Sequence, residues 1–132
     1  MEIEALVGVL RQRLPTLLAV YAFGSRVHGT AGPQSDLDLG LLATSRLDPL
    51  VLWELGPALA SVAGSEVDLL DLRASSTVVQ HRVLETGLRW FVGDPLAVDL
   101  WELQVLRDKQ ELEELRAPLI EDILRSGVVH GR

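Results

Sequence analysis

GSRVHGTAGPQSDLDL, residues 24–39, is the stretch of sequence that decides the fold. It holds a Gly-Ser pair, ten residues that are mostly polar or small, and an alternating Asp-Leu-Asp-Leu. The nearly continuous apolar run before it, residues 16–23, suits a strand covered on both faces. Residues 36–43 alternate in the manner of a strand with one buried face. The ten-residue connection is long enough to return this second strand beside the first.

The residue types in this stretch suit the binding of phosphate and metal. Gly24 lets the backbone approach a ligand closely, and the Ser25 hydroxyl and the amides after it can hold phosphate oxygens. Asp36 and Asp38 share one face of the predicted strand, with Cα atoms about 6.5–7 Å apart. Because Lys109 is the only lysine, these carboxylates need another cation between them, and Mg²⁺ prefers such ligands. Two ions about 3.5–4 Å apart would clamp a phosphoryl displacement.

A third carboxylate is expected from a third strand, predicted at residues 66–72. Asp68 and Asp71 lie on opposite faces of that strand. Asp68 is our candidate, because a carboxylate inside a strand is costly to bury unless a metal or a partner compensates it. Asp71 lies near the end of the strand, where a solvated or capping carboxylate is ordinary. Each of these features alone is common in turns and strands, but their combination favours a functional site.

The remaining pattern predicts an α/β (α+β) fold, a small mixed β-sheet with helices packed on it. Residues 1–132 form one domain, with a core at about 1–93 and a C-terminal helical segment at about 94–126. The helix that begins at Asp94-Pro95 is expected to run to about Arg116, with a last turn or two from Pro118. The other predicted elements are helices over residues 3–14, 49–62 (N-cap Asp48) and 75–86 (C-cap Gly87), and a strand over 88–92.

Composition excludes several classes of function. The net charge of −7 opposes a surface that grips nucleic acid by its phosphates, so no direct nucleic-acid binding is expected. The absence of cysteine excludes disulfides, thiolate zinc sites and cysteine nucleophiles. No apolar run approaches the roughly 18 residues of a membrane span, and the first residues do not form a secretory signal. We therefore expect a cytoplasmic protein.

The segment 24–39 resembles the signature of the DNA polymerase β-type nucleotidyltransferases, and with EVDLLDL at residues 66–72 it is similar to the minimal MntA-type antitoxins. This resemblance implies that Asp36, Asp38 and Asp68 bind Mg²⁺, two ions in all, and that Asp68 also serves as the base or orienting group. It implies that Gly24 and Ser25 hold the triphosphate of ATP.

Three further residues of the loop bear on nucleotide binding. Arg26 and Ser35 join Gly24 and Ser25 as nucleotide-binding candidates, Arg26 because of its charge beside Ser25. His28 departs from the family pattern G-S-x-A-R-G, which has arginine at this point, and this leaves the nucleotide preference open.

The function implied by the resemblance is the transfer of AMP from ATP to a hydroxyl, a tyrosine, of a HEPN-domain ribonuclease toxin, which silences the toxin. Two alternatives stay open. In the first, the chain is a non-catalytic antitoxin that acts by stoichiometric contact. In the second, it is an adenylyltransferase for a small molecule such as an aminoglycoside.

The C-terminal segment carries two apolar stripes where a surface helix needs one. The first is Leu96, Leu100, Leu103 and Leu106, and the second is Trp101, Val105, Leu112 and Leu115. We expect the second stripe to meet the partner or a second copy of the chain, and the many acidic residues there suit a basic partner. Trp53 and Trp90 are predicted to pack in the core or at an edge.

Overall fold

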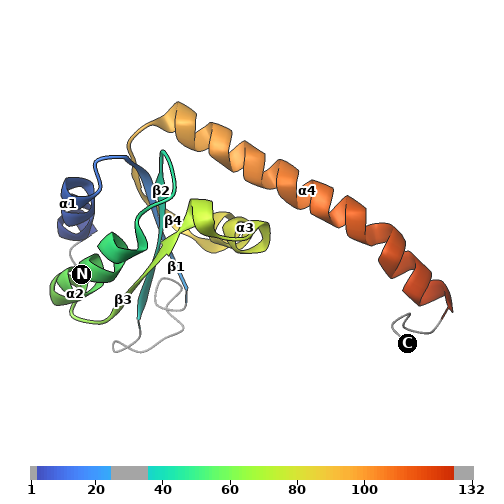
Figure 1. Cartoon of the computed structure of the whole chain (residues 1–132), viewed down its shortest axis with the longest axis horizontal. Coiled ribbons are helices and arrows are strands. Elements are labelled where there is room, and N and C mark those ends of the chain that lie inside the picture. Colours follow the sequence, from blue (N-terminus) through green and yellow to red (C-terminus); the bar gives the residue numbers. More distant parts are fainter. Residues whose placement is uncertain (1–2, 25–35, 127–132) are drawn as a thin grey trace.

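The computed structural model describes residues 3–24 and 36–126, which form one mixed β-sheet with helices on both faces (Figure 1). In chain order the elements are α1 (Ile3–Arg13), β1 (Leu17–Phe23), β2 (Leu37–Ala43), α2 (Pro49–Ala63), β3 (Val67–Asp71), the 3₁₀ turn η1 (Leu72–Ala74), α3 (Thr77–Thr86), β4 (Leu88–Val92) and α4 (Pro95–Ser126). The predicted fold class is confirmed.

The sheet has the strand order β3-β2-β1-β4. β2 returns antiparallel to β1, so that Phe23 lies opposite Asp38. β3 runs parallel to β2, and Asp68 lies opposite Asp38. β4 pairs antiparallel with the other side of β1. The predicted return of the second strand beside the first is therefore confirmed.

One face of the sheet is covered by α1 and α2. The alternating leucines of β2, Leu37, Leu39 and Leu41, are fully buried in this core together with Leu10 of α1 and Leu55 of α2. α2 begins as predicted, because the Asp48 side chain accepts the N–H of Leu50 at 2.9 Å. The alternation leaves the carboxylate of Asp38 off this core.

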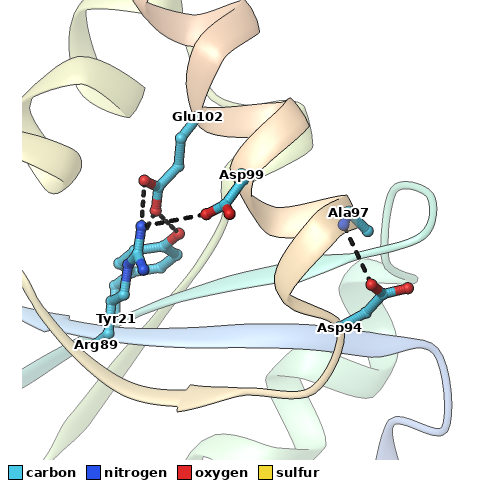
Figure 2. A network of polar contacts seen from close by, with 6 residues as sticks. All are labelled: Tyr21, Arg89, Asp94, Ala97, Asp99 and Glu102. Carbon is cyan, nitrogen blue, oxygen red and sulfur yellow. Dashed lines mark hydrogen bonds and ion pairs between the residues drawn. The ribbon is translucent and has the colours of Figure 1, made fainter.

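The other face is covered by α3 and the first part of α4, with Tyr21 and Leu72 among its buried residues. Tyr21 also anchors α4, since its hydroxyl donates to Oε2 of Glu102 at 2.5 Å (Figure 2). Arg89 of β4 pairs with the same carboxylate and lies 3.9 Å from Asp99. Burial, and then the hydrogen bond and charge of Glu102, raise the pKa of Tyr21 well above its usual value.

The structure corrects the roles of the two stripes of α4. Trp101 and Val105 pack on the sheet, where Val105 is 2% exposed, so their part of the second stripe faces the domain itself. This face of α4 is buried against the adjacent sheet, so no partner is needed to cover it. The large apolar side chains that α4 exposes are those of the first stripe and, farther along the helix, Leu115, Leu119, Ile120 and Leu124. The C-terminal half of α4 extends beyond the body of the domain (Figure 1).

Three further expectations differ in detail. α4 does not end near Arg116 but continues through Pro118 to Ser126. A proline removes one helical N–H, and the neighbouring residues are strong helix formers on an exposed stretch, where water can satisfy the freed carbonyl. α3 begins at Thr77 because Ser76 caps it, and η1 occupies the residues before. Trp53 is not in the core, since it is 76% exposed. Trp90 packs against the core as predicted.

Within residues 3–24 and 36–126, no helix is both long and apolar enough to cross a membrane.

Candidate active site

Three adjacent strands bring the candidate residues together. Gly24 follows the end of β1, Asp38 is the second residue of β2, and Asp68 is the second residue of β3. Because Phe23 lies opposite Asp38 and Asp38 lies opposite Asp68, the three positions form a row across the sheet. Asp36 lies immediately before β2, at the same edge.

Gly24 has a backbone that other residues rarely adopt, with φ of +89°. A Cβ built at this position would also collide with Oδ2 of Asp38. The glycine therefore serves two purposes, because it permits the turn at the end of β1 and leaves space for the Asp38 carboxylate. The sequence predicts that Gly24 lets the backbone approach a ligand, and the group that the structure places against this backbone is an aspartate of the site.

Asp38 is the electrostatic centre of the row. Its pKa is raised, first by partial burial and then by the negative charges of Asp68 and Asp36, with a hydrogen bond to the Asp68 side chain adding to the effect. Asp38 and Asp68 lie opposite each other on β2 and β3, so their carboxylates repel each other when both are ionised. Asp68 itself is exposed, which corrects the expectation of a buried carboxylate. β3 is an edge strand, and its open side explains this exposure.

Asp71 has a structural role instead. It is buried, and its two carboxylate oxygens accept the backbone N–H groups of Leu47 at 2.8 Å and Arg73 at 3.1 Å. The first contact holds the chain between β2 and α2, and the second caps η1. Because both oxygens are engaged, the geometry favours Asp68 over Asp71 as the third carboxylate.

The donor set suits Mg²⁺ only if the substrate contributes ligands. Among the described residues, no three histidine, cysteine, aspartate or glutamate side chains form a set that holds a metal ion by itself. Mg²⁺, however, is usually held by one or two carboxylates, with substrate phosphates and water completing the shell. In the same part of the chain, neither Asp38 nor Asp68 is paired with a basic side chain. Two adjacent, uncompensated carboxylates fit such an ion.

The rest of the predicted nucleotide site lies outside the described residues. This applies to Ser25, Arg26 and Ser35, and also to His28. Their roles remain predictions from the sequence.

The structure adds one feature that the sequence reasoning missed. Trp53 on α2 is exposed, and together with Asp68 it lines a hollow at the edge of β3. Helical spacing gave a usable signal, because Trp53 falls outside the row of Leu55, Leu59 and Ala63 that α2 buries.

Comparison with known proteins identifies relatives of this chain. The chain is 35% identical over 119 residues to protein adenylyltransferase MntA of Shewanella oneidensis, covering 90% of this chain and 85% of that protein. A chain of a toxin–antitoxin crystal structure with AMP-PNP is 34% identical, with a TM-score of 0.81 and coverage of 94% and 99%.

A second solved structure is a complex of a tri-AMPylated Shewanella oneidensis HEPN toxin with an MNT antitoxin. One of its chains is 32% identical to this chain, with a TM-score of 0.76 and coverage of 93% and 96%. The family model described as polymerase beta, nucleotidyltransferase, matches residues 4–94, which include all of the row from Gly24 to Asp68. On this match, and with a fold that agrees with it, the chain belongs to the polymerase beta nucleotidyltransferase family.

Proposed function

We propose that this chain transfers AMP from ATP to a hydroxyl, a tyrosine, of a HEPN-type toxin and silences the toxin in this way. The observation that carries the proposal is the pairing of Asp38 with Asp68 across β2 and β3, beside the backbone of Gly24. The similarity to an MntA adenylyltransferase and to the antitoxin chain beside an AMPylated HEPN toxin supports the same substrate and acceptor. A cytoplasmic location, where ATP is available, is part of the proposal.

In the proposed reaction the hydroxyl oxygen of the acceptor forms a bond to the α-phosphorus of ATP. The bond from that phosphorus to the oxygen bridging to the β-phosphate breaks, and pyrophosphate leaves. Asp68 accepts the hydroxyl proton or orients the hydroxyl for attack. Gly24, with Ser25, Arg26 and Ser35, holds the triphosphate.

Asp36, Asp38 and Asp68 would hold Mg²⁺, two ions in the proposed site. When bound, the metal neutralises charge on the phosphates and on the departing pyrophosphate. Without the ion, burial and then the negative charges of Asp68 and Asp36 raise the pKa of Asp38.

The proposed contact with the toxin lies on the distal half of α4. Beyond Trp101 and Val105 the helix leaves the sheet, yet it carries exposed apolar side chains. A hollow of about 550 Å³ on this half is lined by Glu113, Arg116, Ala117, Ile120, Glu121 and Leu124. Apolar residues with acidic neighbours fit a partner that has an apolar surface and basic residues around it.

Intact-mass spectrometry of the HEPN partner tests the proposal. The partner is incubated with this chain, ATP and Mg²⁺, and in parallel with the double variant Asp36→Asn and Asp38→Asn. We expect a gain of whole AMP units with the wild type and none with the variant. A partner that is neutralised without any gain in mass would refute the transferase and establish the non-catalytic antitoxin instead.

A further inference from the structure

A groove runs along the outer edge of β3, between that strand and α2. It consists of two adjoining hollows of about 480 and 400 Å³, which share Trp53, Gly56, Val67 and Asp68. The helix comes near the strand here, since a Cβ at Gly56 would lie 3.9 Å from the carbonyl oxygen of Val67. The absence of a side chain at Gly56 keeps the groove open.

The walls of the groove are those of a binding surface for polypeptide. Trp53 exposes 76% of its surface, and large exposed aromatic side chains are common anchors in protein interfaces. The floor is an edge strand, whose outward N–H and C=O groups can pair with an extended segment of another chain. Glu66 and Asp68 give the rim a negative charge.

The position of the groove decides which substrate it serves. The strand order places Gly24, Asp38 and Asp68 in a row from β1 to β3, and the groove lies beyond Asp68. In the proposed function, the triphosphate lies at the Gly24 end of the row. In phosphoryl transfer the attacking and leaving oxygens lie roughly in line on opposite sides of the phosphorus. The attacking hydroxyl therefore arrives from the Asp68 end, where the groove lies.

We propose that this groove holds an extended segment of the acceptor protein, the segment that carries the hydroxyl to Asp68, and that Trp53 is the residue that positions it. This inference rests on the proposed function. The occupant packs an apolar side chain against the indole and follows the edge of β3. Trp53 does not touch the reacting atoms, so its effect is on acceptor binding.

Two variants and one control test the groove. Trp53→Ala removes its wall, and Gly56→Leu fills it with a side chain that helices favour. Leu50→Ala is the control, because Leu50 is 61% exposed on the same helix and lies outside both hollows. Initial rates of AMP transfer are measured against the concentration of the HEPN partner. ATP affinity and the melting temperature are measured for each protein.

We expect both groove variants to raise the KM for the acceptor by about tenfold or more. Their kcat should not change, and their ATP affinity should equal that of the control. Rates like those of Leu50→Ala would overturn the groove and leave the proposed function intact. A loss of ATP affinity in Trp53→Ala would also overturn it, by assigning the groove to the nucleotide. A wild type that transfers no AMP would overturn the proposed function, and the inference with it.

Discussion

Replacing Gly24 with alanine should separate the activity of this chain from its stability. With φ at +89°, the new side chain costs roughly 1–2 kcal/mol in backbone strain. Its Cβ would also collide with Oδ2 of Asp38. Because that oxygen is the free end of a side chain, Asp38 can rotate away with little further loss of stability. The rotation, however, moves the carboxylate out of its place beside Asp68, and a displacement of about 1 Å can reduce a rate about 100-fold.

Gly64→Ala is the matched control. Gly64 also has a positive φ, +76°, and a Cβ there would meet nothing within 4 Å. It caps the C-terminal end of α2, where the added methyl group would contact none of the site residues. The two variants should therefore lose a similar free energy of unfolding, about 1–2 kcal/mol, whereas only Gly24→Ala should lose about 100-fold in rate.

Urea denaturation gives the free energy of unfolding, and intact-mass measurement of the HEPN partner gives the initial rate of AMP transfer. Both are measured at a temperature where all three proteins are folded, with ATP at saturation. Equal activity in the two variants would refute the reasoning, because strain at a positive φ would then explain all of the effect. A Gly24→Ala protein with the rate of the wild type would refute the placement of Asp38 in the site.

Four other outcomes follow from the structure. Asp68→Asn should raise the free energy of unfolding in urea at pH 7 by about 0.5–1 kcal/mol, because it removes a like charge from the strand beside Asp38. The same variant should abolish AMP transfer. A less stable variant would contradict this prediction. Tyr21→Phe should lower stability at pH 7 by about 1.5–3 kcal/mol, the value of a hydrogen bond to the charged Glu102. Because the folded-state pKa of Tyr21 is raised, the wild type keeps this advantage below its ordinary pKa of 10.0 and loses it at higher pH, so the two stability curves should converge in alkali and not diverge. Trp101→Ala should cost about 3–5 kcal/mol, and a loss within experimental error would show that α4 is not anchored there. Leu119→Glu should keep the melting temperature and weaken binding of the HEPN partner in titration calorimetry; unchanged affinity would move the interface elsewhere.

The parts of the fold that could be predicted from the sequence are those with a short-range cause. The leucines of β2 alternate because one face of the strand is buried, and that face is the core under α1 and α2. Asp48 and Pro49 predict the start of α2 because a cap and a proline act within one helical turn. Gly24 and Asp38 were predictable for the same reason, since they lie in one motif. Asp68 was selected from its position inside the third predicted strand, but its place opposite Asp38 depends on the parallel pairing of β3 with β2.

The parts that could not be predicted depend on how elements meet. Both stripes of α4 have helical spacing, and only the docking of the helix on the sheet decides that Trp101 and Val105 are covered while Leu100 is exposed. Likewise, the pattern around Asp68 shows a strand but not that the strand lies at an edge. Because β3 lies at the edge, Asp68 is exposed instead of buried, and it is accessible to the acceptor that we propose.

The arrangement of charges explains why the site tolerates its own repulsion. Asp38 is partly buried and lies near two other carboxylates. Burial and the neighbouring negative charges both disfavour its ionised form. Gly24 leaves room for the Asp38 carboxylate, and the open edge of β3 leaves Asp68 in contact with water. Partial burial and the neighbouring negative charges still raise the pKa of Asp38. The repulsion between these carboxylates destabilises the empty site, and a bound cation relieves it. We therefore expect Mg²⁺ and ATP together to raise the melting temperature of the wild type, and to do so far less for the variant that lacks the charges of Asp36 and Asp38.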